Sequence, residues 1–269
     1  MSTAVITLVH GRRAHLERQW AGLSGSTERP ELFLVVGMAE PELADWHPVG
    51  EPAPVLLSLD AAPSRLPLAR ARNAGAAAAL AAGADLLVFL DVDCIPTREL
   101  LRRYRAAADL EPGGLLCGPV GYLPEGLHDP EAFADIAHFH DFRPRPDAGE
   151  LQRGEHRLFW SLSFALTADT WRRVGGFDER YEGYGAEDTD YAMRAEQAGV
   201  PLVWVGGATA FHQFHPTSSP PIQHLDDILR NGALFAETWG WWPMTGWLDR
   251  WVDDGILERS GSGYGRAAG

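Results

Sequence analysis

The chain has 269 residues, 45% of them hydrophobic and 22% charged, which is typical of a folded globular protein. Its formal net charge of −14 argues against nonspecific nucleic-acid binding and against docking on an anionic membrane, since both depend on lysine and arginine. An acidic chain is compatible with a divalent cation, because carboxylates are hard oxygen ligands. The length suits one large α/β domain, alone or with a small appendage.

The first half of the chain alternates short apolar runs with helical patterns. The run at residues 86–90 is fully apolar, as in strands buried on both faces. Gly83 suits a helix C-terminus before it, and Thr97 suits the N-cap of the next helix. This alternation predicts a doubly wound, mostly parallel sheet flanked by helices, with ligands at the carboxyl ends of its strands. We predict strands at 4–9, 32–36, 55–59, 86–90 and 115–120, and helices at 12–23, 68–82 and 98–110.

The second half is less regular. Residues 126–155 are polar and rich in His, Pro and Asp, which predicts a loop-rich connection with one short helix. Five tryptophans lie between Trp239 and Trp251, and we favour packing for them over a sugar-binding or membrane-interface surface. Residues 260–269 are rich in Gly and Ser and are predicted to be disordered. We predict strands at 158–167, 202–205 and 208–212, and helices at 188–198 and 223–239.

The location of the protein is predicted from its cysteines and apolar runs. Cys94 and Cys117 are fewer than a disulfide-dependent secreted protein of this size usually carries. The apolar run at residues 4–9 has no basic segment before it, unlike a signal peptide. No apolar stretch approaches the ~18 residues that span a bilayer. We therefore expect free thiols and a cytoplasmic protein without an integral membrane segment.

Asp91 and Asp93 directly follow the apolar run at 86–90, so they stand at the carboxyl end of a buried strand. In an extended chain, residues i and i+2 point to the same side. Two such carboxylates can hold Mg²⁺ or Mn²⁺ together with a nucleotide diphosphate. The alternative is a solvated turn, and the position after a buried strand favours the metal and nucleotide.

Glu187 and Asp188 stand where a Gly- and aromatic-rich loop leads into a predicted helix. One interpretation is that Asp188 caps the helix, because the dipole stabilises an acid there. The other is general-base catalysis, in which a carboxylate takes the proton of an attacking hydroxyl. The spacing leaves both open.

Other polar residues follow or precede the predicted strands. His212 and His215 come after the strand at 208–212, which would deliver one of them to the rim that carries the Asp pair. A neutral imidazole suits Mn²⁺ better than Mg²⁺, although a lone histidine is more often structural. Further candidates for contacts with a nucleotide or its phosphates lie before the Asp strand (Arg70, Arg72 and Asn73) and after the first strand (Thr7, His10, Gly11 and Arg12).

In combination, these segments resemble a GT-A-fold glycosyltransferase of the family 2 type. The second half is similar to the C-terminal region of β-1,4-galactosyltransferases and bacterial chondroitin polymerases. The resemblance implies a GT-A domain over residues 1–221, with a nucleotide-binding half (1–120) and an acceptor and catalytic half (121–221), followed by a helical, Trp-rich extension (222–259). Its motifs are LARARNAG (68–75), FLDVDCIP (89–96), SLSFAL (161–166), the segment 174–194, and AFHQ (210–213).

The resemblance implies a role for individual residues. Asp91 would lie near the ribose and Asp93 at the metal, with His212 as a further ligand and His215 in reserve; Asp91 is also a candidate ligand. Asp188 would be the catalytic base and Glu187 its acceptor-binding neighbour. The remaining candidates are Tyr184, Trp160 and Gly185 at the acceptor sugar, and Thr7, His10, Arg12 and Arg72 around the uridine.

The predicted function is therefore transfer of a hexose or N-acetylhexosamine from a nucleotide-sugar, expected to be a UDP-sugar, to an acceptor hydroxyl. Retaining relatives carry Glu-Asn where this chain has Glu187-Asp188, so the resemblance implies inversion. Residues 126–155 match no pattern and are expected to set acceptor specificity. The alternatives are a sugar nucleotidyltransferase, a glycoside hydrolase and a carbohydrate-binding module, of which the last leaves the Asp pair unexplained.

Overall fold

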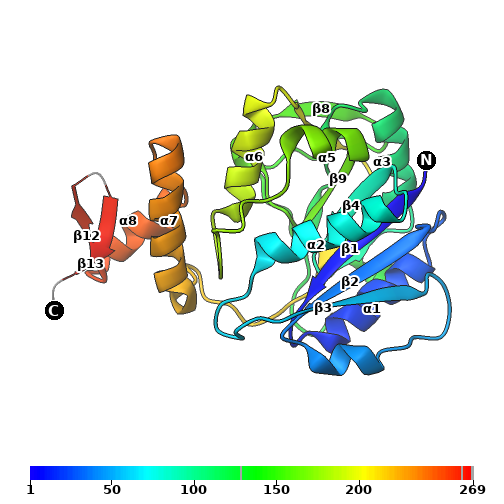
Figure 1. Ribbon diagram of the computed structural model, residues 1–269, viewed down its shortest axis with the longest axis horizontal. Helices are drawn as coiled ribbons and strands as arrows, with labels where there is room; N and C mark the ends of the chain where they lie inside the picture. The colour runs from blue at the N-terminus through cyan, green and yellow to red at the C-terminus, as the bar shows by residue number, and fades with distance from the viewer. Residues whose placement is uncertain (128, 262, 268–269) are drawn as a thin grey trace.

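The computed structural model describes residues 1–127, 129–261 and 263–267. Within these residues, eight strands form the central sheet in the order β3-β2-β1-β4-β9-β6-β10-β8 (Figure 1). Strands β3, β2, β1 and β4 are mutually parallel, while β9 runs antiparallel to β4 and β6. The strands are β1 (Thr3–Val9), β2 (Leu32–Met38), β3 (Pro54–Leu59), β4 (Leu86–Leu90), β6 (Leu115–Cys117), β8 (Leu151–Gly154), β9 (Ser163–Thr167) and β10 (Leu202–Val205).

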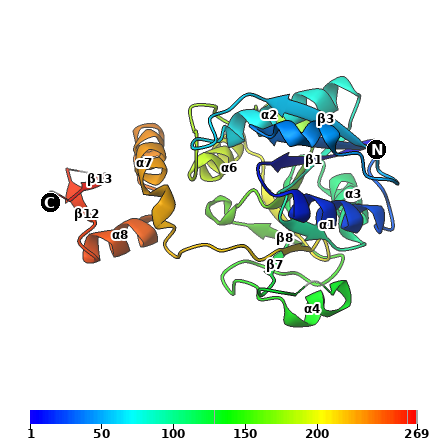
Figure 2. The same cartoon turned by 90° about the horizontal axis from the view of Figure 1, so that it is seen from below.

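Helices cover both faces of this sheet (Figures 1 and 2). Alternate residues of β1 enter opposite cores, with Val5 on one face and Ile6 on the other. The Val5 face packs against α1 (Arg13–Ser24) and α3 (Leu100–Leu110), and the Ile6 face against α2 (Leu68–Ala81), α5 (Ala168–Val174) and α6 (Glu187–Gln197). The predicted doubly wound, mostly parallel sheet is therefore confirmed.

A second, three-stranded sheet in the described part of the chain has the order β5-β11-β7. It consists of β5 (Cys94–Pro96), β11 (Ala210–His212) and β7 (Val120–Tyr122). Its register places His212 opposite Cys94, so a histidine late in the chain meets the residues that follow β4. The short helical segments are η1 (Pro41–Asp45), which lies between β2 and β3, and, later in the chain, η2 (Pro130–Ala132), α4 (Phe133–Ile136) and η3 (His156–Leu158).

Several predicted elements differ from those observed. The strand expected at 115–120 is divided between β6 and β7, and the strand expected at 158–167 begins only at Ser163. Thr97 does not cap α3, because the helix begins three residues later and the buried Thr97 hydroxyl has no hydrogen-bond partner. Residues 126–155 contain the edge strand β8 besides the short helix α4, since β8 pairs antiparallel with β10.

The C-terminal elements pack around their own small core. They are η4 (Ile222–His224), α7 (Leu225–Trp239), α8 (Thr245–Asp253), β12 (Leu257–Ser260) and β13 (Gly263–Arg266). Trp251 is buried there with Leu248, and the Trp242 ring lies 5.3 Å from Tyr264. The prediction of a disordered tail is wrong for residues 263–266, which pair with β12 over Trp242; residues 262 and 268–269 of that prediction lie outside the described residues.

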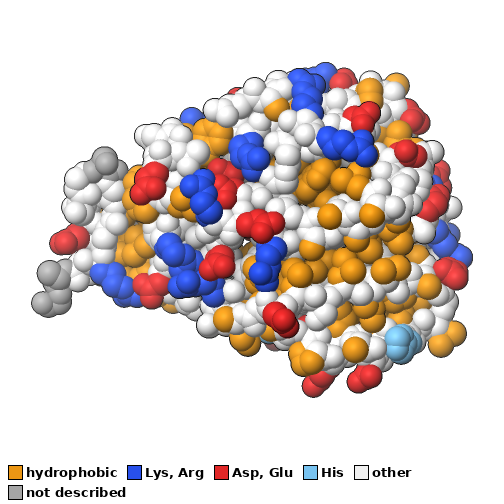
Figure 3. Space-filling model, in the orientation of Figure 1, with side chains coloured by type: hydrophobic (Ala, Val, Ile, Leu, Met, Phe, Trp, Pro, Cys, Tyr) orange, Lys and Arg blue, Asp and Glu red, His pale blue; other side chains and the backbone are white. Residues whose placement is uncertain are grey.

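One face of the molecule carries an apolar region (Figure 3). Apolar side chains gather over β3 and α2, and Val55 on the edge strand β3 is 43% exposed (Figure 3). No described helix is both long and apolar enough to cross a membrane.

Candidate active site

The chain turns sharply where β4 ends. The Cys94 N–H donates to the Asp91 carbonyl at 2.8 Å, which closes a turn rather than continuing the strand. Asp91 therefore faces Arg72, with Oδ1 3.3 Å from Nη2, while Asp93 faces Arg12, with Oδ2 2.5 Å from Nη1. The extended geometry expected for Asp91 and Asp93 is wrong, because the turn directs their carboxylates to different partners.

A buried amide holds this turn in place. The Gln19 side chain donates to the carbonyls of Asp91 (2.7 Å) and Cys94 (3.1 Å). The Thr7 hydroxyl lies 2.9 Å from both the Gln19 amide oxygen and the Leu90 carbonyl. Thr7 and Gln19 are both fully buried, so Thr7 lies beneath the rim and supports the turn. The sequence analysis did not predict a role for Gln19. The feature that could have indicated one is its position as a polar residue in the apolar stripe of the helix at 12–23.

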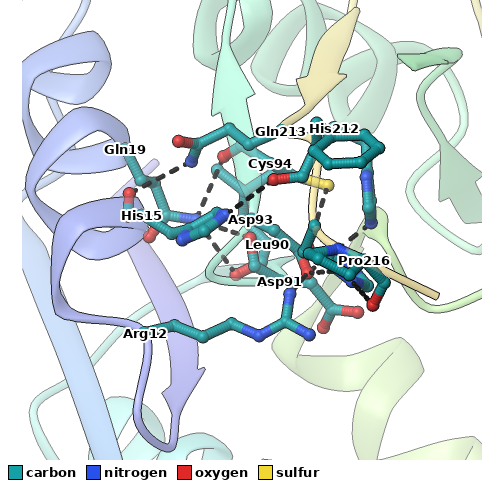
Figure 4. Close-up of polar contacts among 12 residues, drawn as sticks. Arg12, His15, Gln19, Leu90, Asp91, Asp93, Cys94, His212, Gln213 and Pro216 are labelled. Atoms are coloured by element: carbon teal, nitrogen blue, oxygen red, sulfur yellow. Dashed lines mark hydrogen bonds and ion pairs between the residues drawn. The ribbon is translucent and has the colours of Figure 1, made fainter. Parts of the chain in front are cut away.

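Asp93 is the centre of a candidate metal group (Figure 4). Its Oδ2 lies 3.5 Å from His212 Nε2 and 3.6 Å from His215 Nε2, and one ligand atom from each residue lies within 4.8 Å of the others. Partial burial lowers the pKa of His215, which favours the neutral imidazole that binds metals. One carboxylate oxygen and two imidazole nitrogens could hold a divalent transition-metal ion, Mn²⁺ among them. Asp91 is not a member of this group, whereas both histidines are.

Arg72 connects the end of β4 to the start of α6. Its buried guanidinium lies 3.3 Å from Asp91 Oδ1 and 3.3 Å from Glu187 Oε1, with its carbon 5.1 Å from the centre of the Phe177 ring. Its neighbours serve other purposes: Arg70 donates to the Asp60 carbonyl, and Asn73 donates to the Phe177 carbonyl. Of the three polar residues predicted in this helix, Arg72 alone is placed between the two acidic segments.

Two acids at the start of α6, Glu187 and Asp188 (the α6 acids below), lie in surroundings that disfavour their charged forms. Burial raises the pKa of Glu187 to about 7, with a further contribution from Asp188 and an opposing one from Arg72. Burial also raises the pKa of Asp188, whose Oδ1 accepts the Thr189 N–H at 2.7 Å. Asp188 does not cap the helix, because the N-cap residue is Ala186. A carboxylate whose pKa is close to neutral is suited to general-base work.

Comparison with known proteins identifies the fold of this chain. Residues 153–216, which include Asp188 and both histidines of the metal group, match the family described as the N-terminal domain of galactosyltransferase. The chain resembles GalNAc-T7 with UDP, GalNAc and Mn²⁺ at a TM-score of 0.61 and 14% identity, covering 88% of this chain and 50% of that one. It also resembles S. aureus TarS 1–349, at 0.54 and 14%, covering 88% and 66%. The chain has the GT-A fold. The fold implied by the sequence motifs is thus confirmed.

The chain is also similar in sequence to two glycosyltransferases. The chain is 31% identical over 157 residues to validoxylamine A glucosyltransferase of Streptomyces hygroscopicus subsp. jinggangensis, covering 50% of this chain and 36% of that protein. The corresponding enzyme of subsp. limoneus is also 31% identical and is covered to 34%. The chain therefore spans about a third of the length of the curated relatives it matches.

Helix α7 lies beyond the matched family segment and fixes the loop of the GT-A domain that precedes α6. The Asn231 amide lies within hydrogen-bond distance of the carbonyls of Glu182 (3.0 Å), Tyr184 (3.2 Å) and Gly185 (3.0 Å). Asp227 accepts the Tyr184 N–H at 3.3 Å. This loop needs such support because Gly183, Gly185 and Ala186 all have positive φ, a conformation that is strained for the alanine. The sequence analysis did not predict a role for Asn231. The feature that could have indicated one is its position as a polar residue among the buried, apolar positions of α7.

The remaining predicted residues lie at different places around the GT-A site. Tyr184 is 37% exposed and stacks on His224, with ring centres 4.6 Å apart. His10 contacts the Met38 carbonyl at 2.7 Å, at the end of β2. Trp160 lies in an aromatic cluster with His140 and other residues of the segment 126–155. The structure thus brings the metal group, Arg72 and the α6 acids together, and places Trp160 with the segment that the sequence could not assign.

Proposed function

We propose that this chain is a metal-dependent, inverting glycosyltransferase that takes a hexose or N-acetylhexosamine from a UDP-sugar. The observation that carries the proposal is the Arg72 bridge, which joins Asp91 on the metal side to Glu187 beside the candidate base. Solved structures with the same fold contain UDP and Mn²⁺, and the sequence relatives transfer glucose by name, which supports this donor class.

On the donor side, Asp93, His212 and His215 would hold Mn²⁺, and the bound cation would stabilise charge on the departing diphosphate. Arg12 already faces the same carboxylate from a side chain that is 33% exposed, so it can add a second positive charge beside the diphosphate. Asp91 is left free of the metal group and, oriented by Arg72, is the residue proposed to lie near the ribose.

On the acceptor side, Asp188 would accept the proton of the acceptor hydroxyl while that oxygen attacks the anomeric carbon and UDP departs. Its raised pKa makes the carboxylate a stronger base than an exposed aspartate. Glu187, held by Arg72, would accept a hydrogen bond from the acceptor, and Tyr184 would contact its sugar ring. A single displacement of this kind inverts the configuration at the anomeric carbon.

The test begins with a thermal-shift panel of UDP-, GDP- and dTDP-sugars, each with and without Mn²⁺. We expect stabilisation by UDP-sugars in the presence of Mn²⁺ and its loss on addition of EDTA. NMR of the product formed from the stabilising donor then gives the anomeric configuration, which we expect to be opposite to that of the donor. Binding of UDP that is indifferent to Mn²⁺ would contradict the metal assignment, and a product of unchanged configuration would contradict inversion.

A further inference from the structure

We propose that Arg143 and the rings around it form an acceptor subsite for a sugar that carries a carboxylate or a phosphate. The proposal rests on the proposed function, since it assigns part of the acceptor's binding to the segment 126–155. It names a substrate class that neither the metal group nor the α6 acids specify.

Arg143 is a charged side chain without an acidic partner among the residues that the structure describes. Among the described residues, its guanidinium makes no hydrogen bond or ion pair, and its Nε is buried without a partner. It lies instead against two indole rings, 4.4 Å from the centre of the Trp160 ring and 4.9 Å from that of Trp204. Arg72, the other arginine deep in the site, faces two carboxylates. A largely buried cation without an anion is costly, so the structure leaves room for an anion from a ligand.

Arg143 is close to the catalytic residues proposed above. Burial lowers the pKa of Arg143, and the carboxylate of Asp188 is one of the neighbouring groups that oppose this shift. Rings also connect the cluster around Arg143 to the metal group: Tyr122 lies 4.9 Å from His212 and 5.0 Å from His140, centre to centre, and His140 lies 5.4 Å from Trp160. An anion at Arg143 would therefore belong to a molecule that also reaches Asp188.

The surroundings of Arg143 favour a sugar as that molecule. Phe142 is 56% exposed, and its ring lies 5.1 Å from His140 and 5.8 Å from Trp160. Aromatic faces of this kind pack against the apolar C–H face of a pyranose, while a guanidinium binds carboxylate or phosphate in a bidentate manner. The cluster thus offers both contacts that an anionic sugar needs.

An anion on the acceptor is favoured over the diphosphate of the donor. The donor side already has a cation in Arg12 and a group that suits Mn²⁺, both at Asp93. Arg143 lies outside the matched family segment, in the part of the chain expected to set acceptor specificity. The donor diphosphate is also an anion that a guanidinium can bind. The experiment therefore measures the binding of an anionic acceptor and the binding of UDP separately.

The experiment is a calorimetric titration of the intact chain with methyl glucuronide and with methyl glucoside, which differ by a carboxylate. Each is titrated with and without saturating UDP and Mn²⁺, with inorganic phosphate as competitor. The proteins are the wild type, Arg143→Gln, Arg143→Lys and the control Arg145→Gln, which removes an exposed guanidinium that lies 4.4 Å from the Phe139 ring. Circular dichroism checks that each variant is folded.

We expect the wild type and Arg145→Gln to bind the glucuronide at least about tenfold more tightly than the glucoside, with phosphate competing. Arg143→Gln should lose this preference, Arg143→Lys should keep part of it, and UDP affinity should stay the same in all four proteins. A wild type without the preference, or an Arg143→Gln variant that retains it, would overturn the proposal. Weaker UDP binding in Arg143→Gln with the preference intact would assign the anion to the donor and overturn the acceptor subsite. Failure of UDP to bind the wild type would count against the proposed function alone, since the glucuronide preference is also measured without nucleotide.

Discussion

The metal group and the α6 acids lie at the same rim but are held there in different ways. Asp93 lies in the turn that Gln19 fixes, and His212 ends β11, where it pairs with Cys94 of β5, so their positions follow from this turn and this strand pair. The loop before Asp188 is fixed by Asn231, which is 46 residues beyond Gly185 in the chain. The donor half of the site is thus held by the turn after β4 and by the second, three-stranded sheet, whereas the acceptor half depends on a helix outside the matched family segment. The two halves should therefore respond separately to substitution.

The largest effect is expected from Asp188→Asn, which removes the base and leaves the donor half intact. The rate of transfer should fall by about 10³-fold, within the range that general bases contribute, while UDP affinity stays unchanged. Single-turnover kinetics and a UDP titration measure the two quantities. Asp169→Asn is the control, because that carboxylate is 94% exposed. Transfer at the wild-type rate would remove Asp188 from the mechanism.

Asp93→Ala should affect the donor half of the site. It removes the only carboxylate of the candidate metal group among the described residues, so the tightening of UDP binding by Mn²⁺ should fall on the order of 100-fold. Titration of UDP with and without Mn²⁺ measures this, with the exposed His47→Ala as control. Chelation of the metal from the wild type should give the same affinity as the variant, and a Mn²⁺ effect that survives in Asp93→Ala would place the ion elsewhere.

Asn231→Leu tests how far the acceptor half depends on α7. Loss of the amide leaves the loop carbonyls without donors, which should cost about 1–3 kcal/mol of unfolding free energy. KM for the acceptor should rise by roughly tenfold, because about 1.4 kcal/mol corresponds to a factor of ten, with UDP affinity unchanged. Thr238→Ala, also on α7, is the control, since its hydroxyl contacts only its own helix. An equal loss of UDP affinity would mean that the halves are not separate.

The smallest effect is a change in pH dependence. The pKa of Glu187 is raised to about 7 and that of Asp188 is also raised, so the pair binds protons below neutral pH. Because the base must be ionised, kcat should fall as the pH decreases below neutrality, by about tenfold per pH unit at most. A kcat profile at saturating substrate measures this, and an acid limb near pH 4 would show that the acids behave as exposed carboxylates.

The sequence predicts the donor half better than the acceptor half for physical reasons. An apolar run followed by Asp91 and Asp93 marks a strand end, and a second apolar run ends in His212, so their meeting at the rim could be anticipated. The second sheet that brings His212 there, with β11 antiparallel to β5, could not be anticipated. The turn that separates the two carboxylates could not be predicted. It depends on the hydrogen bond from the Cys94 N–H to the Asp91 carbonyl and on the side-chain amide of Gln19, which is distant in the sequence. Asn231 is recognisable only once α7 is known to pack on the loop at 182–185.

The most direct measurement is calorimetric titration of UDP, with and without Mn²⁺, into the wild type, Asp93→Ala and Asn231→Leu. The account predicts Mn²⁺-dependent binding that is equal in the wild type and Asn231→Leu and is lost in Asp93→Ala. Equal binding in all three proteins, or none in the wild type, would contradict a donor site built on Asp93 and its two histidines.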